Sequence, residues 1–437
     1  MGILRINTLD RGSGKHVQTR MFSENELTQN EKHKEYMRAV KEVKLDHLFR
    51  KPFVGCLDGH TEGVTRIVKC STESPLYAST SYDGTIKVWN MNKRAEVETI
   101  ALEQTTPAAI SFLDSTLLYS KKNSIFHRDA NYEEITSGVM AESTAPKETE
   151  FTACSGVMDI VSNGSSRFYA STVDGIEIFD KERIKSIASY KGERQAKRIY
   201  ISSDAKWILY TVEGNKIVGY DSRTGKSELE IVSKSEINAM SIDPSAPSMV
   251  AAGTNSGEIY IYNTYYTGDN SSYITPPCRT LRGHASPVSD IQHSANGTRI
   301  VTGSVDRSVR IFSNDTSHRQ EALYHNKRMQ AINAICCTSD NAYILSGSTD
   351  TNIRIWKLDP NSSTKICTKS EENSRALGNI IKEKYKNVAQ IEAMKRHQIV
   401  PHRIKKSMKN RYDHIKAEQR KEAKRKEHEK TSSPNSV

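Results

Sequence analysis

The sequence predicts an all-β protein, a seven-bladed β-propeller with an N-terminal helical arm and a basic, α-helical C-terminal tail. Three observations lead to this prediction. A pair of short strands separated by a tight turn recurs through the middle of the chain, and the recurrences are about 44 residues apart, a spacing typical of four-stranded propeller blades. The net positive charge of the chain lies entirely in the segment that follows the last recurrence.

Each repeat has an apolar strand with small residues, a turn and an alternating strand that ends in an aromatic residue. The turns usually contain Asp, Asn or Gly, which tolerate the dihedral angles of tight turns. Six of the aromatic residues lie 90, 41, 42, 50 and 44 residues apart, and the first interval spans two periods, so a weaker unit with Phe126 is expected inside it. The seven units occupy 76–90, 117–129, 168–180, 208–221, 249–263, 299–313 and 343–357, and their aromatics are Trp89, Phe126, Phe179, Tyr220, Tyr262, Phe312 and Trp356.

A segment before the first repeat is expected to close the ring. A single blade cannot bury both of its faces, whereas a closed ring gives every blade two neighbours and protects the strand edges. Residues 52–57, with the sequence PFVGCL, precede the first repeat. We expect them to form the outer strand of the last blade.

Two Gly-His pairs, Gly59-His60 and Gly283-His284, precede the turn residues Asp83 and Asp306 by 23 and 22 residues. With these pairs, the repeats resemble the WD40 family from about residue 53 to residue 358. The resemblance implies hydrogen bonds between each His and its turn Asp, joined by Ser79 or Thr302. The Trp-Asp signature of the family is eroded here, and only two blades keep the His, so the remaining blades are expected to rely more on packing. The residues expected to have structural roles in the propeller are His60, Asp83, Trp89, His284, Asp306, Asp350 and Trp356.

The chain divides into three predicted domains: an N-terminal, partly helical arm (1–51), the propeller (52–358) and a basic helical extension (359–437). Residues 23–50 lack Gly and Pro, and Ser23 followed by Glu26 forms a capping-box pattern. One face of this segment is formed by Met37, Val40, Lys44 and Leu48, with Val43 and Phe49 nearby. We expect one or two amphipathic turns packed on the ring; the alternative is a partly disordered arm.

The charge is segregated along the chain. The formal net charge is +11, and residues 361–437 contain 20 Lys or Arg against 9 Asp or Glu. The first 360 residues contain 43 residues of each sign and therefore sum to zero. A neutral body with a cationic tail predicts a polyanionic partner for the tail.

The most basic stretch of the tail, 394–411, holds seven Lys or Arg and no acidic residue. Pro401 divides it, because proline cannot continue a helix hydrogen-bond ladder. Apolar residues recur at helical spacing on both sides of Pro401, and from Lys416 to Lys430 the apolar stripe is lost, as expected of a solvated or nucleic-acid-facing helix. The stripes are Leu377, Ile381, Tyr385, Val388 and Ile391 before Pro401, and Ile404, Met408, Tyr412 and Ile415 after it. The candidate RNA-binding residues are Lys395, Arg396, His397, Arg403, Lys405, Lys406, Lys409 and Arg411.

Patterns that would indicate catalysis are weak. The segment RGSGKH (11–16) lacks the spacing of a phosphate-binding loop and follows no expected strand. The seven Cys form no C-x-x-C pair, so reduced thiols of an intracellular protein are expected rather than disulfides or a metal site. His397 and His402 lie among Lys and Arg, which favours phosphate or polar contacts over metal ligation. We therefore expect no catalytic residues, no metal, no cofactor and no small-molecule substrate, and a propeller acting as a non-enzymatic scaffold.

Membrane and secretion signals are also missing from the sequence. The N-terminus has no apolar h-region, which argues against a secretory signal, and the chain has no run of about 18 apolar residues. We expect no membrane partner, and no homo-oligomer.

Three further segments, in 40–60, 324–335 and 394–409, resemble the Sof-type WD40 proteins, which are nucleolar components of the small-subunit processome. That ribonucleoprotein matures pre-18S ribosomal RNA. The family patterns are L-F-x-K-P-F-x-G, Y-H-x-K-R-M-Q and R-H-x-x-V-P. The matching residues are Leu48, Phe49, Lys51, Pro52, Phe53 and Gly55, then Tyr324, His325, Lys327, Arg328, Met329 and Gln330, then Arg396, His397, Val400 and Pro401.

The resemblance implies a scaffold in ribosome biogenesis, with pre-ribosomal RNA and other processome proteins as partners and the nucleus and nucleolus as its location. It also implies that Lys327, Arg328 and Pro401 make contacts typical of the family. This sequence departs from the family in its eroded second blade and short tail, so we expect some contacts that those parts make in relatives to be missing here.

Two alternatives stay open. Some WD40 proteins are substrate receptors of cullin-type ubiquitin ligases and carry a W-D-x-R box at a blade end, which Tyr220-Asp221-Ser222-Arg223 matches approximately. The other alternative is a cytoplasmic propeller whose basic tail contacts acidic proteins.

Overall fold

The protein was analysed as a computed structural model, and its chain forms two compact units. One unit is the propeller together with the last helix, and the other is a small helical unit that combines residues before the propeller with residues after it. The assignment of 1–51, 52–358 and 359–437 as three domains stays a prediction. The structure describes residues 29–48, 50–70, 75–102, 109–113, 116–129, 147–162, 166–192, 195–202, 208–221, 224–264, 275–315, 318–360, 369–396 and 400–432.

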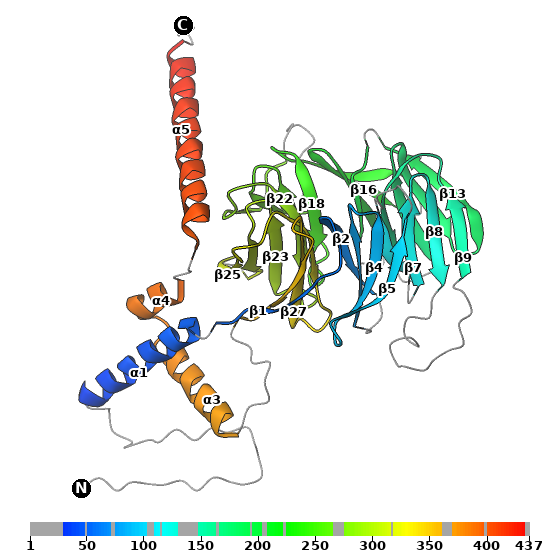
Figure 1. The fold of residues 1–437 in the computed structure, drawn as a ribbon. Coiled ribbons are helices and arrows are strands. Elements are labelled where there is room, and N and C mark those ends of the chain that lie inside the picture. Colours follow the sequence, from blue (N-terminus) through cyan, green and yellow to red (C-terminus); the bar gives the residue numbers. More distant parts are fainter. Residues whose placement is uncertain are drawn as a thin grey trace. The chain divides into compact units, whose positions relative to one another are not determined.

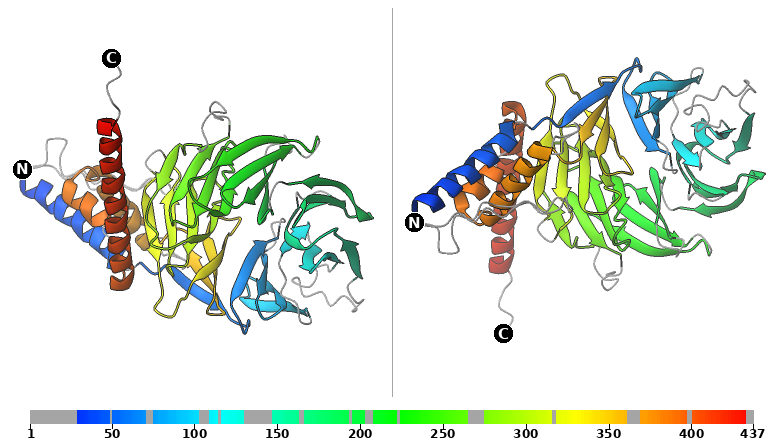
Figure 2. Two further views of the ribbon diagram at one scale, coloured as in Figure 1. Left: turned by 90° about the horizontal axis from the view of Figure 1, so that it is seen from above. Right: turned by 90° about the horizontal axis from the view of Figure 1, so that it is seen from below.

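The propeller unit contains seven antiparallel four-stranded sheets, which confirms the predicted fold (Figure 1). Six blades follow the chain order, strand by strand, and the seventh combines three late strands with the first strand of the chain. Figure 2 shows the first blade, in blue, beside the last, in yellow. The predicted weak unit is present as well, since its two strands form the middle of blade 2 and place Phe126 in the third strand.

In the first six blades the strands run in sequence from the ring centre outwards, and in blade 7 the outermost strand is β1. Blade 1 is β2 (Val64–Lys69), β3 (Leu76–Ser81), β4 (Thr85–Asn90) and β5 (Ala95–Ala101), and blade 2 is β6 (Ile110–Leu113), β7 (Thr116–Lys121), β8 (Ser124–Asp129) and β9 (Lys147–Thr152). Blade 3 is β10 (Val157–Ser162), β11 (Arg167–Thr172), β12 (Gly175–Asp180) and β13 (Arg183–Lys191), and blade 4 is β14 (Arg198–Ile201), β15 (Ile208–Glu213), β16 (Lys216–Asp221) and β17 (Ser227–Val232). Blade 5 is β18 (Ile237–Ile242), β19 (Met249–Thr254), β20 (Ile259–Asn263) and β21 (Arg279–Leu281), and blade 6 is β22 (Val288–His293), β23 (Arg299–Ser304), β24 (Val309–Ser313) and β25 (Gln320–Tyr324). Blade 7 is β26 (Ile332–Cys337), β27 (Tyr343–Ser348), β28 (Ile353–Lys357) and β1 (Phe53–Leu57).

The hydrophobic core of the propeller lies between blades rather than inside them. Each pair of neighbouring blades shares one cluster of buried apolar side chains, so the seven interfaces have seven clusters. The middle strands of each blade are buried on both faces, as β3 and β27 illustrate, because each sheet packs face to face against two others. Removing this apolar area from water is what stabilises the ring.

The predicted closing strand is confirmed. β1 pairs antiparallel with β28, with Phe53 opposite Trp356 and Leu57 opposite Ile353. The ring of Phe53 packs edge-on against that of Trp356, with centroids 5.4 Å apart. Leu57 is buried in the cluster shared by blades 7 and 1, so residues from the two ends of the repeat region complete the same sheet.

Two ion pairs connect blades that are not neighbours. The guanidinium of Arg66 on β2 pairs with the buried Asp159 on β10, joining blades 1 and 3, with Nη2 3.0 Å from Oδ2. Arg198 on β14 pairs with Asp290 on β22, joining blades 4 and 6 over 2.7 Å. Three of the four residues follow a β-bulge in the first strand of their blade, and such bulges redirect side chains. The sequence analysis did not anticipate these pairs.

The same two aspartates also accept backbone hydrogen bonds from further blades. Asp159 accepts the N–H of Ile199 in blade 4 at 3.2 Å, and Asp290 accepts the N–H of Ile335 in blade 7 at 2.8 Å. Each carboxylate therefore connects three blades. Because almost no solvent reaches Asp159, these hydrogen bonds and Arg66 supply the partners that its charge requires.

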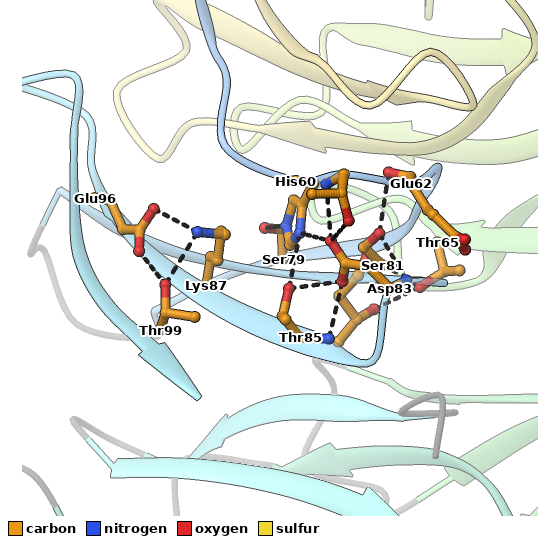
Figure 3. Close-up of polar contacts among 12 residues, drawn as sticks. His60, Glu62, Thr65, Ser79, Ser81, Asp83, Thr85, Lys87, Glu96 and Thr99 are labelled. Atoms are coloured by element: carbon orange, nitrogen blue, oxygen red, sulfur yellow. Dashed lines mark hydrogen bonds and ion pairs between the residues drawn. The ribbon is translucent and has the colours of Figure 1, made fainter. Parts of the chain in front are cut away.

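One face of the propeller carries both the connections between blades and the turns between second and third strands, because the strands alternate in direction; we call it the crossover face. His60 lies there in blade 1 (Figure 3). Its Nδ1 is 3.2 Å from Asp83 Oδ2 and its Nε2 is 2.7 Å from Ser79 Oγ, which also accepts the indole N–H of Trp89 at 2.8 Å. The Ser79 hydroxyl can therefore donate to Nε2, and Nδ1–H to Asp83.

The protonation of this group follows from its surroundings. Burial lowers the pKa of His60, and the neighbouring Asp83 carboxylate only partly offsets this effect. Burial would raise the pKa of Asp83, but hydrogen bonds from Thr85 and Thr61 outweigh it and hold that pKa far below its usual value. At neutral pH the pair is thus a neutral imidazole beside a carboxylate.

Blades 6 and 7 contain variants of this group. In blade 6, His284 Nδ1 lies 3.0 Å from Asp306 and Nε2 lies 2.8 Å from Thr302, while Phe312 takes the place of the Trp. Blade 7 keeps the Trp, which donates to Ser346 at 2.8 Å, but has no such His. There Asp350 pairs instead with Arg354 through two hydrogen bonds of 3.0 and 2.5 Å.

The helical unit consists of α1 (Gln29–Leu48), α3 (Lys369–Lys384) and α4 (Ala389–Arg396). Ala39, Val40 and Val43 of α1 are buried against Ile391 of α4, and partly buried residues of α3 and α4 complete the cluster. The α1 helix is longer than the one or two turns expected, and helices from the other end of the chain cover its apolar face. The proposed capping box at Ser23 and Glu26 and the segment 11–16 lie outside the described residues.

Before Pro401 the tail forms two helices, although its apolar residues recur at helical spacing without a break. α3 ends at Lys384, a turn follows in which Val388 N–H donates to the Tyr385 carbonyl, and α4 starts at Ala389. The predicted apolar stripe is preserved across the turn, since Ile381, Tyr385, Val388 and Ile391 belong to one cluster. The break lets both helices place their apolar faces on α1.

Candidate nucleic-acid interface

The last helix, α5 (His402–Ser432), holds most of the predicted RNA-binding residues. It begins directly after Pro401, whose carbonyl accepts the N–H of Lys405 at 3.0 Å as the first helical hydrogen bond. Proline suits the start of a helix for two reasons. The first N–H groups of a helix have no partner within it, so the missing N–H costs nothing, and the ring fixes φ near the helical value. The predicted boundary at Pro401 thus coincides with a helix start.

Three side chains in the first turns of α5 are buried or contact the propeller. Ile404 is buried. Met408 Sδ lies 3.5 Å from a guanidinium nitrogen of Arg310 in blade 6, and Arg411 donates a hydrogen bond to the carbonyl of His284. Arg411 also lies against Gly257, where φ is +79° and a side chain would meet the guanidinium. These contacts, which we call the α5 seat, lie on the crossover face of blades 5 and 6.

Arg310 makes the seat unusual. It is 1% exposed, yet its nearest carboxylate, Asp306, is 3.7 Å away, and its other partners are Gln320 at 2.9 Å and the thioether of Met408. Burial lowers the pKa of Arg310, and Asp306 opposes this effect. Sequence reasoning missed Arg310 because nothing in its local pattern indicates that a helix 98 residues away would cover it.

The other predicted cations of α5 are exposed. Arg403, Lys405, Lys406 and Lys409 all face solvent in the first turns of the helix, which contain no acidic residue. Among the α5 side chains that the structure describes, no Lys or Arg pairs with a carboxylate. Cations at a helix N-terminus face the positive end of the helix dipole, an arrangement that an external anion would relieve.

The distal half of α5 is as rich in Lys and Arg as the first half, but it contains four of the five acidic residues of the helix and has no apolar stripe. Tyr412 is 62% exposed, and Lys416 Nζ lies 5.9 Å from the centre of its ring. The whole helix contains 12 Lys or Arg against 5 Asp or Glu. A long helix of this composition has no core to join and can present its cations to a polyanion.

The predicted residues before Pro401 lie in the helical unit. Lys395 is partly buried, and burial together with Lys382 and Lys386 lowers its pKa. The side chain of Arg396 and the whole of His397 are outside the described residues. Two other tail lysines are already paired with α1, since Lys382 contacts Asp46 at 2.7 Å and Lys384 contacts Glu35 at 2.6 Å. Among the described residues, α3 thus uses two of its lysines to bind α1, whereas the exposed cations of α5 have no carboxylate partner.

Lys327 and Arg328 of the family motif lie on the crossover face, in the connection between blades 6 and 7. Both are exposed, whereas the next residue, Met329, is completely buried in the cluster between these blades. Met329 N–H donates to the Asn326 carbonyl at 3.1 Å and closes a tight turn. The buried Met thus fixes a turn that presents the two cations.

The described residues include no group of three or more His, Cys, Asp or Glu that could hold a metal ion. Cys56, Cys154, Cys278, Cys336 and Cys337 are free thiols. Within the described part of the chain, no helix combines the length and apolar character that crossing a membrane would require.

Comparison with protein-family models defines the class. Residues 51–90, 275–313 and 323–357 match the WD domain, G-beta repeat, so this is a WD40-repeat propeller protein. The WD40 β-propeller domain of Doa1 has the same fold, with a TM-score of 0.57 over 70% of this chain and 97% of that one, at 18% identity.

The residues after the propeller show which kind of WD40-repeat protein this chain resembles. Residues 360–437 match the Sof1-like domain, so the chain combines WD40 repeats with a Sof1-like domain, and the resemblance to Sof-type proteins is confirmed. Protein SOF1 of Saccharomyces cerevisiae is 27% identical over 96% of this chain and 90% of its own length. The DDB1- and CUL4-associated factor 13 of Xenopus laevis is 27% identical over 92% of this chain and 88% of its own length, and that of Homo sapiens 25% over the same shares.

Proposed function

We propose that this protein is a non-enzymatic scaffold of the small-subunit processome in the nucleolus, where it supports pre-18S ribosomal RNA processing and assembly of the small ribosomal subunit. In this role the propeller docks neighbouring proteins and the α5 helix contacts ribosomal RNA. The similarity to Protein SOF1 over nearly the whole chain supports the proposal.

The observation that carries the proposal is the charge of α5. Its exposed cations have no carboxylate partner among the described residues, whereas two lysines of α3 do. Within one chain, therefore, the cations that serve folding and those available to a partner are distinguishable. Unpaired cations spaced along one helix match the repeating phosphates of a nucleic-acid backbone.

Such contacts predict a strong salt dependence. Each phosphate neutralised by Lys or Arg releases counterions, and the log–log slope of affinity against salt is about −0.9 per contact on a duplex and −0.7 on single strands. About eight contacts would give a slope near −6 to −7. Phosphate contacts position a protein without reading sequence, so specificity would come from RNA shape and from neighbouring proteins.

The test replaces Arg403, Lys405, Lys406 and Lys409 together with Gln and measures binding to a labelled RNA hairpin across a salt series. The slope should become shallower by about 3, because four contacts are removed. The matched control replaces four exposed cations of blade 3 with Gln and should leave the slope unchanged; these are Lys181, Arg183, Lys185 and Lys191. Equal slopes for both variants would contradict the proposal.

Substitution is preferable to deleting 361–437, the change that the sequence alone suggests. That deletion would remove α3 and α4, and Val43 would then lose its buried environment. A loss of RNA binding could then reflect damage to the helical unit. The four substitutions keep every buried residue in place.

A second candidate function is a substrate receptor of a cullin-type ubiquitin ligase. Its support is the printed name of several relatives, DDB1- and CUL4-associated factor 13. In the approximate box at the end of blade 4, Tyr220 and Asp221 are buried, and Asp221 accepts a hydrogen bond from Thr224 at 3.2 Å, so both serve the fold. Ser222 and Arg223 are outside the described residues.

Co-sedimentation after nuclease treatment separates the candidates. Loss of the protein from large particles supports assembly on RNA, and retention on DDB1 supports the receptor role. Retention on acidic proteins in the cytoplasm would instead favour a propeller whose tail binds those proteins.

A further inference from the structure

A groove of about 410 Å³ lies between blades 5 and 6. One wall is β21 with the following residue, and it provides Arg279 and Arg282. The other wall belongs to blade 6 and includes Phe312, His318 and Gln320. Both arginines are exposed, whereas Phe312 is buried, so the groove has an apolar floor and cationic edges.

The groove is cationic. Among the described residues that line it, none is a carboxylate. Glu258 contacts Arg282 from outside the lining, with 3.0 Å between the carboxylate and Nε. Burial lowers the pKa of His318, and the charge of the nearby Arg279 lowers it further.

Comparison with blade 1 shows what is different here. Lys87 of blade 1 corresponds to Arg310, because each lies two residues before the aromatic near the end of its strand. The ammonium of Lys87 contacts Glu96, the residue opposite that aromatic, at 2.6 Å. In blade 6 the residue opposite the aromatic is Gln320. Arg310 therefore meets a neutral amide at 2.9 Å where Lys87 meets a carboxylate. The substitution removes a negative charge next to the groove.

The groove continues into the α5 seat through three consecutive residues. Arg282 lines the groove, Gly283 packs over Arg310 and Gln320, and the carbonyl of His284 accepts the hydrogen bond from Arg411 of α5. A Cβ on Gly283 would lie 2.8 Å from the Arg310 guanidinium and 3.1 Å from Gln320, so a larger residue here would displace the ends of these side chains.

We propose that the groove between blades 5 and 6 is a phosphate-binding site for the RNA backbone, continuous with the cationic face of α5. The proposal rests on the RNA-binding role of α5 and extends it to the propeller. Arg279 and Arg282 are the binding residues: guanidinium groups present paired donors that match phosphate oxygens.

A phosphate site in the groove would also explain why the α5 seat holds the helix at this place on the propeller. The contacts of Met408 and Arg411 hold the base of the helix beside the groove, so one RNA strand can meet cations of the helix and of the ring in succession. Two contact regions on one strand add their counterion release, and their fixed spacing favours an RNA of matching shape.

The test uses the full-length protein with Arg279→Gln and Arg282→Gln together. Binding to a labelled RNA hairpin is measured over a salt series, beside a matched control with Arg183→Gln and Lys185→Gln on the outer strand of blade 3. All four residues are exposed, so the melting temperatures of both variants should equal that of the unmodified protein. The groove variant should have a slope shallower by about 1.4 to 1.8, the contribution of two phosphates.

The outcomes separate this inference from the proposed function. If the groove variant keeps the slope of the control while the four α5 substitutions reduce it, the groove is not a phosphate site and α5 alone binds RNA. If neither set of substitutions changes the slope, the proposed function fails together with the groove.

Discussion

At the scale of single residues, the His groups of the crossover face show which side chains position the blades. In blade 1 the hydrogen bonds run from the Trp89 indole to Ser79, then to His60 and finally to Asp83. Blade 6 keeps the His and the Asp without the Trp, and blade 7 keeps the Trp without the His. The His–Asp contact and the Trp–Ser contact are thus separable.

This separability gives a test. His60→Ala leaves a cavity and removes a partner of Ser79 and Asp83, so the free energy of unfolding should fall by about 2 to 4 kcal/mol. Trp89→Phe copies the aromatic of blade 6, removes one hydrogen bond and should cost about 1 kcal/mol. Urea denaturation of both variants provides the measurement, and equal losses would show that the His has no special role.

Buried histidines also predict a pH dependence. Burial lowers the pKa of His60 and His284, and that of His293 to about 4. An unfolded His has a pKa near 6.5, so the unfolded chain binds protons more readily than the folded one. Stability is therefore full above about pH 6.5 and declines as the pH falls below it. Thermal melting should shift downwards between pH 7.5 and pH 5; a constant melting temperature over this range would contradict the assignment.

At the scale of elements, β1 is a short strand with a large effect on the stability of the ring. Four of its five residues pair with β28, with an irregularity at Val54, and Leu57 is buried between blades 7 and 1. It also covers an edge that would otherwise expose unpaired N–H and C=O groups.

Removal of residues 1–57 should therefore lower the melting temperature sharply. A control that removes only residues 1–28 keeps α1 and β1 and should melt close to the full chain. If the longer truncation melts like the shorter one, β1 does not hold the ring closed.

Helix boundaries show how far local patterns could be followed. Pro401 predicts the start of α5 because its restriction is local. The break between α3 and α4 at 385–388 has no proline or glycine to indicate it, and the spacing of apolar residues continues through it. Only the packing of both helices on α1 explains the break.

At the scale of the whole molecule, the ring is fastened both at its edge and at its centre. Asp159 and Asp290 each connect three blades, and blades 1, 3, 4, 6 and 7 are joined in this way. The bulge residues Asn238 and Asn333 each donate to a carbonyl of the next blade at 2.9 Å. Contacts between distant blades can form only when the ring is closed, so they stabilise the complete ring.

The central pairs can be tested against an exposed one. Asp159→Asn leaves Arg66 without its counter-charge in a poorly solvated site and should cost about 3 kcal/mol. Glu236→Gln breaks the exposed pair with Lys197 and should cost little. Urea midpoints of the two variants give the comparison; similar small shifts would mean that the centre is better solvated than its burial indicates.

The sequence by itself determined the number of blades, the closing strand, the helix start at Pro401 and the concentration of positive charge after the propeller. These features are periodic or local, so patterns of residues close together in the sequence indicate each of them. Only the tertiary structure decided that α1 packs with α3 and α4, that Arg411 and Met408 seat α5 on blades 5 and 6, and that Arg66 meets Asp159. Those contacts join residues far apart in the chain, and their partners are selected by ring closure and by the burial of apolar faces, which no local pattern records.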